Sequence, residues 1–217
     1  MTKAAFATAI FDVDSTISGI EGVDWLATRR SREIAREVFK ATAKAMRGEI
    51  ALEQVYGQRL ELVRPTRGDI DALGEAYINA VAPGVRDLLR ALITAKVTVK
   101  LVSGGLRPAL LILAEHLGVA ASDLHAVDVT FDAEGLYTGY EVSSLLTTST
   151  GKGTLVESLR LPRPILAVGD GSTDLAMKPA VDRFVCFTGF VHRDAVVARA
   201  DASVQTFEQI RRMVLPA

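Results

Sequence analysis

Short runs of branched apolar residues alternate along the chain with longer segments in which apolar residues recur at helical spacing. The apolar runs have the length of strands and occupy residues 5–11, 97–102, 164–168, 183–187 and 202–204. The periodic segments predict helices over residues 84–95, 107–117, 152–160, 174–180, 193–199 and 206–213. Strands that are almost continuously apolar and alternate with helices are typical of a parallel sheet covered on both faces. The pattern therefore predicts an α/β protein with a doubly wound, mostly parallel, Rossmann-like sheet.

Residues 18–79 interrupt this alternation, because they have helical periodicity and contain no convincing strand. Val23, Leu26 and later apolar residues recur at roughly helical spacing. We interpret the segment as a small helical cap inserted after the first strand. The predicted division is a core made of residues 1–17 and 80–217, with the cap between them.

A second interruption lies near residues 125–142, where branched and aromatic residues alternate with polar ones. The sequence Asp-Ala-Glu-Gly at 132–135 lies in its middle and is typical of a hairpin turn. We therefore expect a small β-hairpin attached to the core.

The composition is that of an ordinary globular protein of 217 residues, with 49% apolar and 24% charged residues. The formal net charge is −1 and charges of both signs are interspersed, which argues against a surface for nucleic acid or anionic membranes. No stretch has the roughly 18 apolar residues needed to span a bilayer, and the N-terminus lacks a secretory signal pattern. The lone Cys186 excludes an internal disulfide. We therefore expect a cytoplasmic protein that binds neither nucleic acid nor membranes.

Small and polar residues follow three of the predicted strands and begin one predicted helix. Asp12 and Asp14 follow the first strand, residues 103–105 (Ser-Gly-Gly) follow the second, and residues 169–174 (Gly-Asp-Gly-Ser-Thr-Asp) follow the third. Lys152 begins the helix. In an open α/β sheet, ligands bind beyond the carboxyl ends of the strands. If these strands are neighbours, one crevice collects carboxylates, a lysine, hydroxyls and glycine N–H groups.

Such a crevice combines a cation site with an anion site. Clustered carboxylates repel one another unless a cation lies between them, and Mg²⁺ prefers oxygen ligands such as Asp12 and Asp170. Ser103, Gly104 and Lys152 offer a hydroxyl, a backbone N–H and an ammonium group to a phosphate. Phosphoryl transfer needs a cation beside an anion site, so the sequence predicts a Mg²⁺-dependent enzyme of this class.

The two carboxylates after the first strand can divide the chemistry between them. Asp12 can attack phosphorus, because aspartate forms acyl-phosphate intermediates. In an extended segment Asp14 would face the same way as Asp12. Asp14 could then protonate the leaving oxygen and later accept a proton from the hydrolytic water.

Four motifs carry a resemblance to a known family. DVDST at 12–16, SGG at 103–105, GKG around Lys152 and GDGSTD at 169–174 resemble, in this order, the motifs of the haloacid dehalogenase (HAD) superfamily. The chain most resembles the phosphoserine phosphatase family of that superfamily, and the likeness spans about residues 6–205. The resemblance implies a HAD core with a helical cap.

The resemblance also implies a role for each motif residue. It makes Asp12 the nucleophile and Asp14 the general acid and base. The implied Mg²⁺ ligands are Asp12, Asp14 through its backbone carbonyl, and Asp170, with Asp174 supporting the metal site. The implied phosphate-binding residues are Ser103, Gly104 and Lys152.

Four further residues correspond to substrate-binding positions of the family. Glu21 would meet the substrate ammonium group, and Arg59 would meet the substrate carboxylate, for which a guanidinium fork is suited. Met46 would line the pocket from the cap. Thr173 stands where many members have Asn and is the fourth candidate.

The leading hypothesis is hydrolysis of O-phospho-L-serine to L-serine and phosphate through an aspartyl-phosphate intermediate. A phosphatase for another small phosphomonoester, a phosphotransferase, and a signalling domain phosphorylated on aspartate are the alternatives. The cap argues against the signalling domain, because an enzyme needs to exclude water until its substrate is bound. In the enzymatic cases the partner is a small-molecule phosphomonoester, and monomer and homodimer both remain open.

Overall fold

The computed structural model describes residues 4–215 and is built around a six-stranded sheet. The strand order is β3-β2-β1-β6-β7-β8, and every neighbouring pair is parallel. The strands are β1 (Thr8–Phe11), β2 (Thr98–Leu106), β3 (Leu124–Val127), β6 (Ile165–Gly169), β7 (Arg183–Phe187) and β8 (Ala202–Val204). The predicted fold class, a doubly wound parallel sheet, is therefore confirmed.

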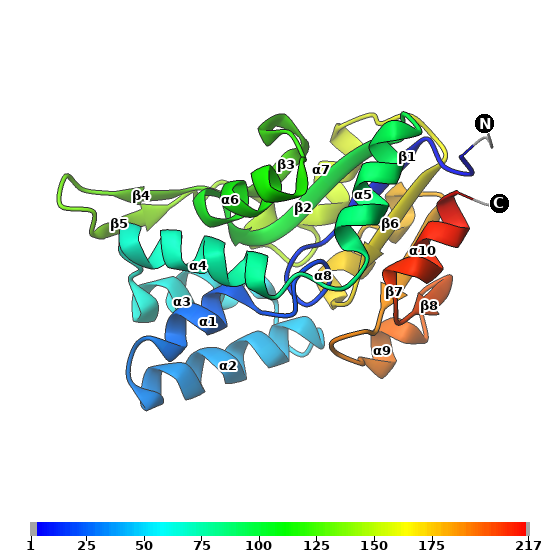
Figure 1. Cartoon of the computed structure of the whole chain (residues 1–217). Helices are drawn as coiled ribbons and strands as arrows, with labels where there is room; N and C mark the ends of the chain where they lie inside the picture. Colours follow the sequence, from blue (N-terminus) through cyan, green and yellow to red (C-terminus); the bar gives the residue numbers. More distant parts are fainter. Residues whose placement is uncertain (1–3, 216–217) are drawn as a thin grey trace.

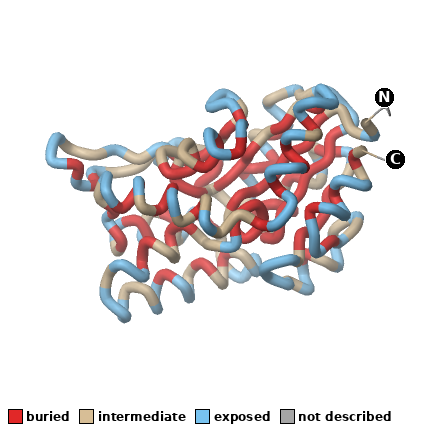
Figure 2. The backbone as a smooth tube through the Cα atoms, in the orientation of Figure 1, coloured by how far each residue is buried: buried red, intermediate tan, exposed pale blue. Residues whose placement is uncertain are grey.

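The central strands of the sheet are covered on both faces. Every residue of β1 and of β6 is buried, although successive side chains point to opposite faces of a strand. Figure 2 shows this buried layer running through the middle of the molecule, with exposed residues on the surrounding helices. The apolar runs of the sequence are thus explained by burial from two sides.

One strand of the sheet was not expected from the sequence. Residues near 125–142 were expected to form only a hairpin, but β3 pairs with β2 in the main sheet. The hairpin itself is shorter and consists of β4 (Val129–Phe131) and β5 (Tyr137–Tyr140). The pattern did not distinguish β3 from the hairpin because a single residue, Asp128, separates the end of β3 from the start of β4.

Helices of the core connect the parallel strands, and a final helix follows the last of them. They are α5 (Val85–Thr94), α6 (Arg107–Leu117), α7 (Gly151–Ser158), α8 (Ser172–Leu175), α9 (Asp194–Val197) and α10 (Phe207–Val214), with the short 3₁₀ turns η2 (Ala121–Asp123), η3 (Leu145–Thr147) and η4 (Lys178–Ala180). None of the helices among residues 4–215 is long and apolar enough to cross a membrane.

The segment between β1 and β2 contributes a separate group of helices. They are α1 (Gly22–Thr28), α2 (Arg32–Met46), η1 (Leu52–Gln54), α3 (Tyr56–Val63) and α4 (Arg67–Asn79). Figure 1 shows this blue-to-cyan group gathered beside one end of the sheet. The last member, α4, packs against the core helix α6, so the inserted helices rest directly on the core.

The β4-β5 hairpin reaches the same group of helices. The backbone N–H of Arg67 donates a hydrogen bond of 3.0 Å to the carbonyl of Gly135 in the hairpin turn. The guanidinium of Arg64 donates to the carbonyl of Tyr137 over 3.1 Å. Figure 1 shows the hairpin projecting from the core alongside α4. The hairpin therefore joins the core to the start of α4.

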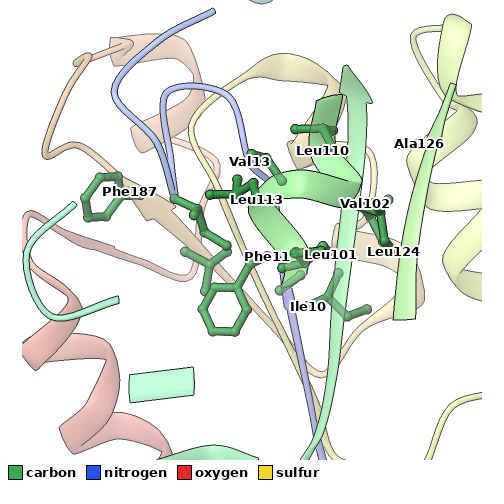
Figure 3. Packing of buried hydrophobic residues seen from close by; sticks show 14 of the residues in the cluster. Ile10, Phe11, Val13, Leu101, Val102, Leu110, Leu113, Leu124, Ala126 and Phe187 are labelled. Atoms are coloured by element: carbon green, nitrogen blue, oxygen red, sulfur yellow. The ribbon is translucent and has the colours of Figure 1, made fainter. Parts of the chain in front are cut away.

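Apolar packing fixes the end of β1. Phe11 lies with its ring centroid 6.3 Å from that of Phe207 in α10, and Phe207 lies 5.0 Å from Phe187. Val13, the residue after Asp12, is completely buried, and Figure 3 shows it among the core residues. Asp12 stands between two anchored apolar residues, so its backbone position is rigid.

Candidate active site

A small cavity lies at the carboxyl edge of the sheet, beneath the inserted helices. Its volume is about 50 Å³, which leaves room for only a few water molecules. The predicted site residues that line it are Asp12, Asp14, Glu21, Met46, Arg59, Gly104, Lys152, Asp170, Thr173 and Asp174. Ser103 lies just behind this lining and contacts Asp14. The fold thus brings all the predicted site residues to one place.

Lys152 is the central cation of this cavity. Its Nζ lies 2.5 Å from Oδ1 of Asp12 and 2.5 Å from Oδ1 of Asp174, and all three side chains are buried. Burial by itself lowers the pKa of a lysine, but the two carboxylates raise the pKa of Lys152 above its ordinary value. Lys152 therefore stays positively charged next to the position of an incoming anion.

Asp174 holds the loop that follows β6. Its Oδ2 accepts hydrogen bonds from the backbone N–H groups of Asp170 (3.1 Å) and Gly171 (2.9 Å). Because its other oxygen accepts from Lys152, Asp174 fixes both the lysine and the loop carrying Asp170. This arrangement suits a residue that supports a metal site.

Three buried carboxylates form a group that fits a divalent metal ion. One oxygen from each of Asp12, Asp170 and Asp174 lies within 4.8 Å of the others. Burial and the neighbouring Asp174 charge raise the pKa of Asp12 well above its ordinary value, and a cation among these oxygens would favour the ionised form. Buried carboxylate oxygens are the donors that hard divalent cations prefer. The residues present therefore fit such an ion.

Asp14 is held on both of its carboxylate oxygens. Oδ1 accepts hydrogen bonds from the backbone N–H of Gly22 (2.6 Å) and from the hydroxyl of Tyr77 (2.7 Å), and Oδ2 accepts one from the hydroxyl of Ser103 (3.0 Å). Burial and the Asp14 charge raise the pKa of Tyr77 well above its ordinary value, so its hydroxyl remains a donor. Asp14 reaches the cavity through a tight turn in which Ser15 has a φ of +52°, and not through the extended segment expected from the sequence.

The residues 103–105 leave the regular pairing of β2 with β3. The register shifts between Val102 and Leu106, so the Ser-Gly-Gly segment bulges at the edge of the cavity. A Cβ atom on Gly105 would lie 3.0 Å from Oδ2 of Asp14, and this close approach favours glycine there. The bulge explains why β2 continues beyond the predicted end at 102.

Glu21 and Arg193 lie on one side of the cavity. The hydroxyl of Ser15 donates a hydrogen bond of 2.7 Å to Oε1 of Glu21, and the Arg193 guanidinium lies 3.8 Å from the same oxygen. Burial, together with the Asp14 charge, raises the pKa of Glu21 to about 7. Arg193 also lies against the Asp170 carboxylate. Glu21 is therefore an anion whose charge changes near neutral pH.

Arg59 approaches the cavity from α3 and is held by two residues of the inserted helices. Its Nη1 donates a hydrogen bond of 2.8 Å to the hydroxyl of Thr42, which donates in turn over 2.5 Å to Oδ1 of Asp24. Arg59 is only 6% exposed, and its Nε has no hydrogen-bond partner among residues 4–215. The guanidinium thus retains donor capacity for an anionic ligand.

Met46 and Thr173 complete the lining. Met46, at the end of α2, has its sulfur 3.1 Å from where a Cβ on Gly171 would lie, so the inserted segment touches the loop after β6. Thr173 is a buried residue of α8.

Sequence reasoning missed Arg193, Tyr77, Asp24 and Thr42. Arg193 follows the end of β7, so examining that fourth strand end would have found it. Tyr77, Asp24 and Thr42 lie within helices, where a tyrosine or a single polar residue gives no signal of its own.

Comparisons with known proteins show which family the chain resembles. Residues 9–178 match the family model of the haloacid dehalogenase-like hydrolases. A chloroplastic phosphoserine phosphatase of Arabidopsis thaliana is 32% identical over 205 residues, with 92% of this chain and 69% of that protein covered. A phosphoserine phosphatase of Homo sapiens is 32% identical over 203 residues, with 92% of this chain and 89% of that protein covered.

A solved structure agrees in fold. A substrate-bound phosphoserine phosphatase complex has a TM-score of 0.81 with this chain at 23% identity, covering 96% of this chain and 98% of the other. At this identity the likeness is one of fold.

Proposed function

The chain belongs to the haloacid dehalogenase-like hydrolases and, within them, to the phosphoserine phosphatases, and from this premise we propose that it hydrolyses O-phospho-L-serine with Mg²⁺ as cofactor. It is a phosphoric monoester hydrolase with a site for a divalent metal and a small phosphoester as substrate. The observation that carries the substrate proposal is that one anionic and one cationic side chain, Glu21 and Arg59, line the same cavity as Asp12 and Lys152.

The substrate has three charged groups, and the cavity offers a partner for each. The phosphate would bind the Ser103 hydroxyl, the Gly104 N–H and the Lys152 ammonium group. The substrate ammonium group would face Glu21. The substrate carboxylate would accept from Arg59, whose Nε has no hydrogen-bond partner in the described part of the chain. An arginine fork binds a carboxylate through two parallel hydrogen bonds, which gives the amino-acid end its orientation.

Hydrolysis would proceed in two steps at the phosphorus atom. A carboxylate oxygen of Asp12 attacks phosphorus as the bond from phosphorus to the serine oxygen breaks, and Asp14 donates a proton to that oxygen. A water molecule then attacks the aspartyl phosphate while Asp14 takes its proton. The bond from phosphorus to Asp12 breaks, and phosphate leaves.

The metal would be held by the carboxylates of Asp12 and Asp170 and by the backbone carbonyl of Asp14, with Asp174 as support. When bound, Mg²⁺ supplies positive charge that neutralises these carboxylates and the phosphoryl oxygens. Lys152 would contribute further positive charge next to the phosphoryl group, since its Nζ contacts the proposed nucleophile Asp12.

The inserted segment, residues 18–79, is proposed to act as a cap over a core of residues 1–17 and 80–217. Its contacts with the core support this proposal. The hydroxyl of Ser149 accepts from the Leu52 N–H over 2.7 Å and donates to Glu53 over 2.9 Å, and the Ser172 hydroxyl donates to the Ala45 carbonyl over 2.9 Å. Breaking these bonds along one edge of the inserted segment would admit substrate, and their re-formation would enclose it.

A cytoplasmic location belongs to the same proposal and is supported by the unpaired, buried Cys186. Fractionation of the source cells with an antibody against the chain tests it.

The test of the function is phosphate release by the purified protein with Mg²⁺, with phosphoserine compared with phosphothreonine and sugar phosphates. We expect the highest kcat/KM with phosphoserine and no turnover by Asp12→Asn. Efficient phosphate release from a sugar phosphate alone would show that the protein is a phosphatase and that phosphoserine is not its substrate. Transfer of phosphate to an added alcohol would instead make the protein a phosphotransferase.

A further inference from the structure

Tyr77 contacts the proposed acid and base of the reaction from a position outside the cavity lining. It lies in the last turn of α4, is completely buried, and places its hydroxyl 2.7 Å from Oδ1 of Asp14. A buried hydroxyl without a partner is costly, and a phenylalanine would fill the same space at no such cost. The hydroxyl therefore has its effect through Asp14.

The space around this hydroxyl is shaped for the contact. A Cβ atom on Gly22 would lie only 2.0 Å from the Tyr77 hydroxyl oxygen, so a side chain there would push the hydroxyl away. The Ser18 hydroxyl donates a hydrogen bond of 3.0 Å to the Tyr77 carbonyl and holds its backbone. Because α4 packs against the core helix α6, Tyr77 is supported by the core as well as by the inserted segment.

The two oxygens of Asp14 have donors of different kinds. Oδ1 accepts from the Gly22 N–H and from Tyr77, neither of which is assigned to the substrate. Oδ2 accepts from Ser103, which is assigned to the phosphate. When the Ser103 hydroxyl turns to a bound phosphate, Oδ2 loses its donor and Oδ1 keeps both of its own.

We propose that Tyr77 is a positioning residue that, with the Gly22 N–H, fixes Oδ1 of Asp14 and leaves Oδ2 as the oxygen that carries the proton. The inference rests on the proposed function and adds to it a division of work between the two oxygens. In the first step the proton moves from Oδ2 to the leaving oxygen as the phosphorus–oxygen ester bond breaks. In the second step Oδ2 takes a proton from the attacking water.

The test compares leaving groups in Tyr77→Phe, which removes only the hydroxyl. Phosphoserine and ethyl phosphate release alkoxides that need a proton, whereas acetyl phosphate releases acetate, which does not. We expect kcat/KM to fall about 10-fold for the first two substrates and to stay within about two-fold for acetyl phosphate, because general acid catalysis contributes only where the leaving group needs it. Ethyl phosphate lacks the amino-acid groups, so its loss would not come from a disturbed amino-acid pocket.

Tyr137→Phe is the matched control. The Tyr137 hydroxyl is also buried but has no hydrogen-bond partner within residues 4–215, so its removal should leave all three substrates unchanged. If Tyr77→Phe does not fold, Gly22→Ala provides the second variant, because the added methyl displaces the Tyr77 hydroxyl. The same dependence on leaving group is expected.

The outcomes separate this inference from the proposed function. Equal losses on all three substrates, or no loss on the two alkyl phosphates, would overturn the role of Tyr77 while leaving the phosphatase intact. Absence of phosphate release by the unaltered protein would reject the proposed function and this inference with it.

Discussion

The hydroxyl of Tyr56 donates a hydrogen bond of 2.7 Å to the backbone carbonyl of Gly104. This bond joins α3 of the inserted segment to the loop proposed to bind phosphate. Tyr56 is buried and its ring packs on Tyr140 of the hairpin, with ring centroids 5.3 Å apart. The position of the inserted helices and the shape of the phosphate site are therefore coupled directly.

Removing this bond should weaken catalysis on every substrate. A net hydrogen bond is worth about 1 kcal/mol, so Tyr56→Phe is expected to lower kcat/KM about five-fold for phosphoserine, ethyl phosphate and acetyl phosphate alike. Steady-state kinetics on the three substrates measure this. Unchanged kcat/KM values would show that the bond contributes nothing to closure.

Thr42→Val should weaken binding of the amino-acid end of the substrate and leave binding of the phosphate end unchanged. The change keeps the side-chain shape but leaves Arg59 Nη1 and Asp24 without their shared partner. Hydrogen bonds to charged groups are worth about 1.5–3 kcal/mol, so KM for phosphoserine should rise about 10-fold or more. KM for ethyl phosphate, which has no carboxylate, is the internal control, and a parallel rise in both would contradict the role given to Arg59.

The pH dependence of the phosphoserine reaction should contain a contribution from Glu21. Its pKa is raised to about 7, so below that pH the side chain is neutral and no longer attracts the substrate ammonium group. We expect kcat/KM for phosphoserine to fall as pH decreases from 8 to 6 more steeply than kcat/KM for ethyl phosphate. Ethyl phosphate has no ammonium group, so the pH dependence of its kcat/KM contains the ionisation of the phosphate ester without the effect of Glu21 on the ammonium group.

Glu21→Gln is the matching variant for this pH effect. This variant should have a low kcat/KM for phosphoserine at all pH values. The pH profile of that kcat/KM should run parallel to the profile measured with ethyl phosphate. A profile that keeps the steeper fall would assign the ionisation to another group.

Mg²⁺ should stabilise the folded chain through Asp12 and Asp170. A ligand that binds only the folded state at 100 times its Kd adds about 2.7 kcal/mol, which corresponds to a Tm increase of about 5–10 °C for a chain of this size. Thermal unfolding with Mg²⁺ and with a chelator measures the difference. Asp170→Asn should remove most of the response, whereas Asp71→Asn, at an exposed position of α4, should retain it. A full response in Asp170→Asn would mean that the ion binds elsewhere.

Much of the fold and the site could be predicted because the reactive polar residues lie in short, contiguous segments at the ends of the strands. Asp12 and Asp170 directly follow buried strands, Ser103 lies in the bulge near the end of β2, and parallel pairing brings such ends to one edge of the sheet. The same reasoning applied after β7 leads to Arg193. These residues are predictable since the backbone alone determines where they lie.

Other contacts could not be predicted because they depend on how helices pack. Tyr77 meets Asp14 only because α4 rests on α6, and this contact joins residues 63 positions apart. Thr42 meets Arg59 across two inserted helices in the same way. The turn after β1 was also unforeseen, since nothing in the sequence marks Ser15 as a residue with positive φ.

The bonds that Arg64 and Arg67 form with the β4-β5 hairpin restrain one side of the proposed cap. Lifting α3 and α4 would break both bonds or carry the hairpin along, so that side of the inserted segment is the anchored one. The opposite side is held to the core by short polar contacts near Ala45 and Ser149. If the inserted segment opens as proposed, we expect the entrance to lie beside the end of α2, where Met46 lines the cavity.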